Sequence, residues 1–228
     1  MRIEDTQLAV NILDAKCPSA VKFDVFRRIN TGGVPLNTQE VRNIMATPAT
    51  RKLLQDMAAD EWFIKATRNR INDIRMGAQE LCLRYIAYNQ LYDAENRIFT
   101  DFGNMTDLLD EMIVKLNAMR EEQHAVILQD FSLAMEKCYS LLGEIAFSKP
   151  KNPNVINRAL FTSFSIVLTQ DWRDAGWLEI NQMKAKEMLT GYLENYKEYF
   201  NAITSSTSSR KNMEIQFQYA HRLLEELF

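Results

Sequence analysis

Features that would identify a function directly are scarce in this sequence. Its 228 residues carry a net charge of −3, so the chain lacks the overall positive charge of proteins that coat nucleic acid. No run of about 18 apolar residues is present, and the N-terminal stretch MRIEDTQ has no apolar signal core. We therefore expect a cytoplasmic protein that makes no membrane contact.

Metal-binding and catalytic motifs are also missing. Cys17, Cys82 and Cys138 lie far apart and form no CxxC pair, and His124 and His221 have no neighbouring cysteine or histidine. This spacing argues against a zinc site and a disulfide framework, so no metal ligand is assigned. No Walker A, GxSxG or HExxH pattern occurs, and no catalytic residue is assigned. Both histidines lie in polar stretches, and we expect them at the surface.

Glycine is scarce, and two of the seven glycines lie side by side. Average glycine usage is about 7%, so the pair Gly32-Gly33, followed by Pro35, is the most unusual point in the chain. Paired glycines let the backbone adopt positive φ and leave it uncovered by side chains. The pair either caps the preceding helix and turns the chain, or lets the backbone approach a ligand closely.

Apolar spacing predicts helices over most of the chain. Asn37 and Glu40 have the spacing of a capping box at the start of a helix from Thr38 to about Met45. The segment 77–92 is apolar on nearly all sides, which predicts a central helix. Helices are expected at about 18–29, 38–45, 51–59, 60–67, 77–92, from 106 onward, 121–147, 154–170, 178–203 and 209–227.

The segment 5–14 alternates apolar and polar side chains, so one β-strand is expected there. A single strand needs a partner for its backbone groups, supplied either by another piece of polypeptide or by a second copy of the chain. The predicted fold is therefore mainly α: a multi-helix bundle of about eight to ten helices with one N-terminal β-strand.

A family resemblance starts at the paired glycines. The segment from Phe26 to Asn43, FRRINTGGVPLNTQEVRN, resembles the second signature segment of the bacterial proteins called domain of unknown function 262. That domain forms the N-terminal part of GmrSD-type modification-dependent restriction enzymes, and its head is similar to the ParB/sulfiredoxin fold. The resemblance continues in Asp73-Ile74-Arg75-Met76, in ELCLRY from Glu80, in NRALF from Asn157, and in Ser208-Ser209-Arg210.

This resemblance implies a division of the chain and a function. Residues 1–46 would hold a residual strand and the FxxxN/GG motif of the ParB-like head, and residues 47–228 the α-helical domain. The family's first signature, a DGQQR-like loop associated with nucleotide binding and hydrolysis, does not occur in this chain. We therefore expect the helical C-terminal portion of a prokaryotic defence-type, NTP-dependent DNA nuclease component, inactive by itself, with most of its catalytic head missing.

The resemblance also implies cofactors and partners. The intact relative would be an NTPase and DNA endonuclease that uses an NTP and Mg²⁺, whereas no cofactor is expected in this chain alone. The expected partner is the missing N-terminal head or a second copy of the chain, with DNA as a further partner. The alternative function is a non-catalytic interaction module that dimerises through the 5–14 strands, because exposed strand edges are templates for another chain.

The resemblance nominates residues for a nucleotide or DNA site. Phe26 would be its packing residue and Asn30 its hydrogen-bonding residue, while Gly32 and Gly33 would allow close backbone approach. Three arginines bring positive charge to the same corner and are candidates for binding phosphate: Arg27, Arg28 and Arg42. For each arginine the alternative is a solvated charge on a helix face.

Two further groups of charges have open interpretations. Glu80 and Arg84 are four residues apart in a helix expected to be buried, which predicts a structural ion pair, with Arg75 as a candidate third member. The segment 65–75, KATRNRINDIR, contains four basic residues and one acidic residue. It either lies along a nucleic-acid backbone or forms a solvated loop.

Overall fold

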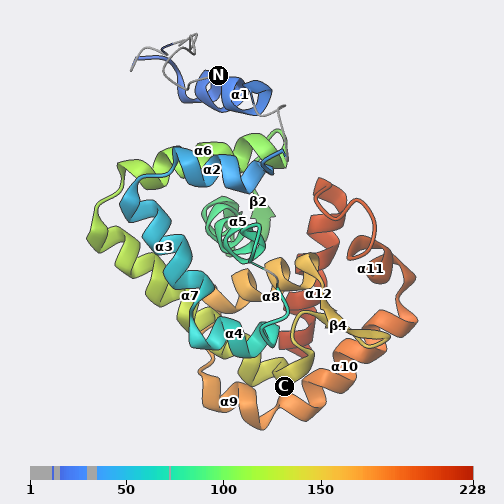
Figure 1. Ribbon diagram of the computed structural model, residues 1–228. Helices are drawn as coiled ribbons and strands as arrows, with labels where there is room; N and C mark the ends of the chain where they lie inside the picture. The colour runs from blue at the N-terminus through green and yellow to red at the C-terminus, as the bar shows by residue number, and fades with distance from the viewer. Residues whose placement is uncertain (1–11, 13–15, 30–34, 72, 228) are drawn as a thin grey trace, which may run out of the picture.

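The computed structural model describes residues 12, 16–29, 35–71 and 73–227. The strand expected at 5–14 falls outside these ranges except for Ile12, and so do Asn30, Gly32 and Gly33. Within the described ranges the chain is mainly α-helical and forms a multi-helix bundle, which confirms the predicted fold class (Figure 1). Of the helices in these ranges, none is both long enough and apolar enough to cross a membrane.

The described ranges contain twelve α-helices, one short 3₁₀ turn and two antiparallel pairs of short strands. In chain order these elements are α1 (Ser19–Ile29), α2 (Thr38–Met45), α3 (Pro48–Ala58), α4 (Glu61–Thr67), α5 (Gly77–Leu91), β1 (Tyr92–Asp93), β2 (Ile98–Phe99), α6 (Met105–Ala118), α7 (Glu121–Leu142), η2 (Gly143–Ile145), β3 (Ser148–Lys149), β4 (Asn152–Ile156), α8 (Arg158–Gln170), α9 (Ala175–Ile180), α10 (Gln182–Asn195), α11 (Lys197–Ala202) and α12 (Arg210–Glu226).

Helix α5 lies at the centre of the bundle, as its sequence predicts. Figure 1 looks along its axis, and α2, α3, α6 and α8 pack against it. Its buried side chains include Leu81, Leu83 and Tyr85. Because a helix that is apolar on nearly all sides loses unfavourable contact with water on every face when it is enclosed, burial of α5 stabilises the whole bundle.

Helix α7 is the longest described helix, and it packs against α3, α4, α8, α9 and α10. The ring of Phe131 on α7 lies 5.0 Å from that of Tyr85 and 5.6 Å from that of Phe63, between centroids. Phe63 in turn meets Phe161 edge to face at 6.0 Å. These four rings join α4, α5, α7 and α8 into one core, since each buries a large apolar area.

Several helices begin at a side chain that caps them. The Asn37 side chain accepts a hydrogen bond from the Glu40 N–H at 2.8 Å, and the Glu40 carboxylate accepts one from the Asn37 N–H at 2.6 Å. The predicted capping box is therefore confirmed. Asn157 caps α8 by accepting bonds from two N–H groups. Such caps pair the N–H groups that the first turn of a helix leaves without partners.

The chain departs from the predicted boundaries in three regions. The helix predicted over 121–147 ends at Leu142, where α7 gives way to η2. The region 178–203, predicted as one helix, is divided among α9, α10 and α11, because Asn181 and Tyr196 have non-helical backbone angles. The region 154–170 begins as β4 and becomes helical only after Asn157. The β1–β2 and β3–β4 hairpins were not predicted, since strands this short carry almost no alternating pattern.

Candidate functional site

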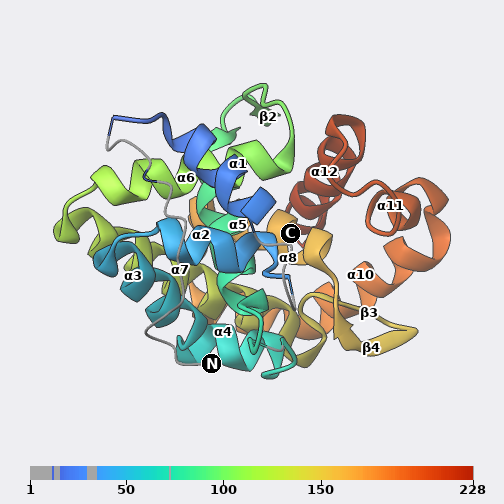
Figure 2. The same cartoon turned by 45° about the horizontal axis from the view of Figure 1, so that its top comes forward.

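Two motif residues on α1, Phe26 and Arg28, lie at the surface of the bundle. Helix α1 packs against α2 and α6 (Figure 2). The Phe26 side chain is 38% exposed, and Arg28 forms an ion pair with Asp24 at 2.9 Å, one turn earlier on the same helix. Arg27 belongs to the same helix. Phe26 and Arg28 are thus accessible, whereas the asparagine and the paired glycines of the motif fall outside the described residues.

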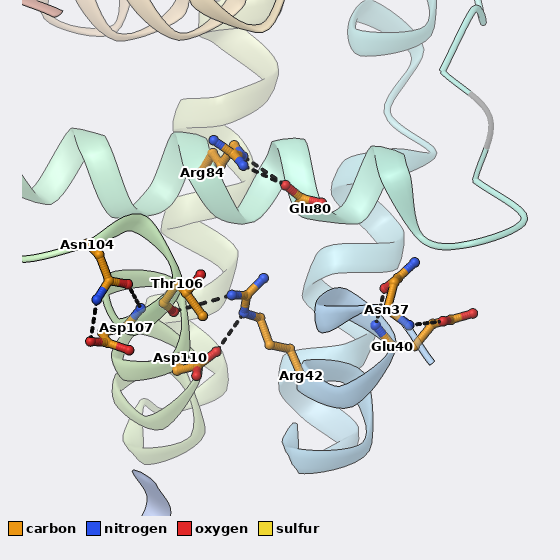
Figure 3. A network of polar contacts seen from close by, with 9 residues as sticks. All are labelled: Asn37, Glu40, Arg42, Glu80, Arg84, Asn104, Thr106, Asp107 and Asp110. Carbon is orange, nitrogen blue, oxygen red and sulfur yellow. Dashed lines mark hydrogen bonds and ion pairs between the residues drawn. The ribbon is translucent and has the colours of Figure 1, made fainter. Parts of the chain in front are cut away.

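Arg42 lies in the interior and not in a ligand-accessible position. Its side chain is 3% exposed, and its Nε donates to Asp110 Oδ1 at 2.8 Å. Its Nη2 lies 3.3 Å from the Thr106 carbonyl oxygen (Figure 3). Both partners belong to α6, so Arg42 ties α2 to α6. The structure therefore gives Arg42 a structural ion pair where the sequence suggested a phosphate contact or a solvated charge.

Gln39 was not singled out by the sequence and is unusual in the structure. It lies on α2, within the segment that carries the family resemblance, and is 1% exposed. Neither polar atom of its side-chain amide has a hydrogen-bond partner among the described residues. An unpaired buried polar group costs about 1–3 kcal/mol. Gln39 is therefore a group that would gain from a hydrogen bond to a ligand or a water molecule.

Arg75 pairs with α2 and not with Glu80. Its Nη2 lies 2.7 Å from Glu40 Oε2 and 2.7 Å from the Pro35 carbonyl oxygen. The Asn37 amide donates to the Arg75 carbonyl at 2.9 Å. The hydrogen bond from Arg75 lowers the pKa of Glu40 below its usual value, and the Asn37 N–H adds to this effect. Arg75 therefore belongs to a different ion pair from the predicted one. Its contacts connect the loop before α5 to the start of α2.

Glu80 and Arg84 form the ion pair that their spacing suggests. Arg84 Nη2 and Nε donate to Glu80 Oε1 at 2.7 and 3.0 Å (Figure 3). Arg158, at the start of α8, lies 3.6 Å from the same oxygen. Burial raises the pKa of Glu80, but Arg84, Arg158 and Arg42 outweigh burial and hold that pKa below its usual value. Glu80 therefore stays ionised and holds two guanidinium groups at the junction of α5 and α8.

A groove opens beside this cluster. Its smaller part, about 20 Å³, lies between α5, α8 and the start of α12, and its larger part, about 200 Å³, lies between α12 and the loop after β2. Both parts are lined by Ser208 and Met213, so they adjoin at these two residues. We call this feature the arginine groove and define it by Arg84, Asp101, Arg158, Thr162, Thr207, Ser208, Ser209 and Arg210.

The three arginine side chains of the arginine groove differ in how far they are exposed to solvent. Arg84 is largely enclosed, with 20% of its side chain exposed, whereas the side chains of Arg158 and Arg210 are 59% and 61% exposed. Arg210 lies 3.2 Å from Glu214 and 3.8 Å from an Asp101 oxygen. Exposed ion pairs of this kind contribute roughly 0–1 kcal/mol. Arg210 can therefore exchange these partners for an anionic ligand at little cost.

The basic segment 65–75 makes mainly intramolecular contacts. Lys65 and Arg75 form ion pairs with glutamates. Arg68 donates hydrogen bonds to the β3–β4 hairpin, one of them to Ser148 at 2.9 Å. Arg70 is exposed. Three of the four basic side chains thus have partners within the chain, which favours a structural loop over a strip that follows a nucleic-acid backbone.

Both histidines depart from the expected surface position. His124 is 7% exposed, with its Nε2 3.0 Å from the Leu116 carbonyl oxygen. His221 is half-buried, with its Nε2 2.5 Å from the Tyr92 hydroxyl. Burial lowers the pKa of His221, and the charge of Arg97 lowers it further.

In the part of the chain that the structure describes, no three His, Cys, Asp or Glu side chains are grouped so that they could hold a metal ion.

Comparison of the chain with protein-family models, with curated proteins and with solved structures found no match. The resemblance to the domain-262 family therefore stays a prediction that rests on the quoted segments.

Proposed function

We propose that this chain is the helical scaffold of a prokaryotic defence-type, NTP-dependent DNA nuclease component of the domain-262 type, and that its arginine groove binds phosphate groups of DNA or of the nucleotide. One observation carries the proposal. Three segments that resemble the family, around Arg84, Arg158 and Ser208–Arg210, are far apart in the sequence and line the same groove. Their convergence supports a shared role in ligand binding.

The chemistry of the arginine groove suits a phosphate ligand. Guanidinium groups present paired N–H donors that match phosphate oxygens, and the hydroxyls of Thr207 and Ser208 can donate further hydrogen bonds. Glu80 neutralises one charge, so the cluster of Glu80, Arg84 and Arg158 keeps a net positive charge. Since Arg158 projects into solvent, a phosphate can reach it without any rearrangement of the core.

The proposal gives this chain a binding and supporting role. It includes no metal ligand and no catalytic step in this chain. The NTP and Mg²⁺ would be used by the intact component, whose head carries the hydrolytic residues. The exposed α1 surface around Phe26 is the face that we expect to lie against that head.

Salt-dependent DNA binding tests the proposal. Binding of a short fluorescein-labelled duplex is followed by fluorescence anisotropy at increasing salt. Each phosphate contact contributes about 0.9 to the slope of log K against log salt concentration. The double variant Arg158→Gln/Arg210→Gln should therefore bind more weakly and reduce that slope by about 2. A parallel titration with ATP and Mg²⁺ separates the nucleotide from DNA as the source of the phosphate.

Two single variants serve as controls. Lys115→Gln removes an exposed charge on α6, away from the arginine groove, and should leave affinity and slope unchanged. Arg70→Gln removes the exposed cation of the segment 65–75. If Arg70→Gln weakens binding while the double variant binds like the wild type, the site lies on that segment and the proposal fails. It also fails if the wild type binds neither duplex nor ATP at low salt.

A further inference from the structure

A second, larger cavity lies on a different part of the molecule from the arginine groove. It measures about 520 Å³ and lies between the β3–β4 hairpin and the helices α10 and α11. The hairpin lies beside α10 in Figures 1 and 2. Cavities of about 300–1,000 Å³ are typical of small-molecule sites. We call it the lysine pocket, and its polar and aromatic lining comprises Lys149, Lys151, Asn152, Glu194, Lys197 and Phe200.

Both walls of the lysine pocket are held to the bundle. On the hairpin side, Arg68 donates to Ser148 Oγ at 2.9 Å and to the Pro153 carbonyl oxygen. The Asn157 N–H donates to the Phe147 carbonyl at 2.6 Å. The Asn157 side chain also donates to the Ile203 carbonyl at 2.8 Å, directly after α11. The hairpin and the helical wall are therefore positioned before any ligand arrives, which lowers the entropy cost of binding.

The charges in the lysine pocket are unbalanced. Three lysines line it against one carboxylate, that of Glu194. Within the described part of the chain, none of Lys149, Lys151 and Lys197 lies in an ion pair with an acidic side chain. Ammonium groups are compact charges that bind phosphate well. The pocket therefore favours an anionic ligand.

The lysine pocket also offers an aromatic surface. Phe200 is 36% exposed, and the Lys149 ammonium lies over its ring, 5.6 Å from the centroid. Leu193 adds an apolar, buried floor. A flat ring gains free energy when it stacks on an aromatic side chain. Here the stacking surface and the cation that would bind an attached anion are neighbours.

We propose that the lysine pocket binds a planar aromatic ring that carries a phosphate group, of about the size of a mononucleotide. The ring stacks on Phe200, and Lys149 and Lys197 bind the phosphate. Asn152 and Glu194 can hydrogen-bond polar groups on the ring or on the linker between ring and phosphate. This site is separate from the arginine groove and does not depend on the function proposed for it.

Isothermal titration calorimetry with AMP tests the lysine pocket. Adenosine and ribose 5-phosphate supply the ring and the phosphate separately, so each should bind more weakly than AMP. Because stacking of a base on an aromatic side chain is lost in Phe200→Ala, AMP affinity should fall roughly tenfold. The double variant Lys149→Ala/Lys197→Ala should reduce AMP affinity to that of adenosine. Lys115→Ala, on α6, is the matched control and should bind AMP like the wild type.

Two outcomes would overturn the inference. One is that wild-type protein binds AMP no better than it binds adenosine or ribose 5-phosphate. The other is that AMP affinity is unchanged by Phe200→Ala but lost in Arg158→Gln/Arg210→Gln, which would assign AMP to the arginine groove. Melting temperatures without ligand show whether each variant is folded. Since Phe200 and both lysines are at least partly exposed, their replacement should leave the fold intact.

Discussion

Replacing Arg42 distinguishes a structural role from a ligand-binding role. Arg42→Met keeps an unbranched apolar stem but removes the guanidinium that pairs with Asp110 at 2.8 Å. The two side chains are 3% and 11% exposed, so the substitution breaks a buried ion pair and removes the guanidinium that faces the Asp110 carboxylate. Breaking a buried pair in this way costs about 3–5 kcal/mol. For a chain of this size about 1 kcal/mol corresponds to 2–4 °C, so the melting temperature should fall by roughly 6–20 °C.

Three further variants make this prediction specific. Lys52→Met breaks an ion pair of similar length, 2.7 Å to Asp56, whose lysine side chain is 73% exposed. It should lower the melting temperature by only about 2 °C or less. The double variant Arg42→Met/Asp110→Leu removes both buried charges and should recover most of the loss, whereas Asp110→Leu alone should not.

The assay is thermal unfolding followed by circular dichroism, with urea unfolding to obtain the free energy of unfolding. Wild-type stability in Arg42→Met would refute the structural role. If that stable variant also bound DNA or ATP more weakly, the guanidinium would be a ligand contact, as the sequence first suggested. Reduced stability with recovery in the double variant would instead establish that Arg42 joins α2 to α6.

Three further predictions concern protonation and reactivity. Burial raises the pKa of Glu80 but the neighbouring arginines lower it more, so its ion pair stabilises the fold above pH 4.5 and is lost as the pH falls through the lowered pKa. Glu80→Gln should therefore flatten the dependence of melting temperature on pH below pH 4.5, and an unchanged dependence would contradict this. The lowered pKa of His221 means that the folded state prefers the neutral ring, so stability is fully present above pH 6.5 and declines as the pH falls through that lowered pKa. His221→Gln should remove this decline, and an NMR titration of His221 that gave a pKa of 6.5 or above would refute the assignment. Burial raises the pKa of the Cys82 and Cys138 thiols, so only Cys17 should react with Ellman's reagent before unfolding; reaction of a second thiol in the native protein would count against the buried core.

Features with local causes could be predicted from the sequence. The capping box of Asn37 and Glu40 and the ion pair of Glu80 and Arg84 both depend on the spacing of residues along one helix. The central position of α5 followed from apolar side chains on nearly all of its faces. Each of these features involves residues within a few turns of one another, so the helical period is enough to place them.

Boundaries and short strands were harder to predict. The breaks at Asn181 and Tyr196 interrupt an apolar pattern that continues on both sides, so the pattern alone does not reveal them. The β3–β4 hairpin is held by Arg68, whose position in the sequence gives no sign of this contact. The lysine pocket depends on that hairpin and could not be foreseen without it.

By itself, the sequence determined that the described chain is mainly helical, where several of its helices begin, and which helix lies innermost. The tertiary structure alone decided which charges meet: Arg42 with Asp110, Arg75 with Glu40, and Arg158 with Glu80. Helix periodicity and capping are local, so they can be deduced from neighbouring residues. Long-range pairs depend on how the helices pack against one another, and that packing reflects the summed burial of the whole core.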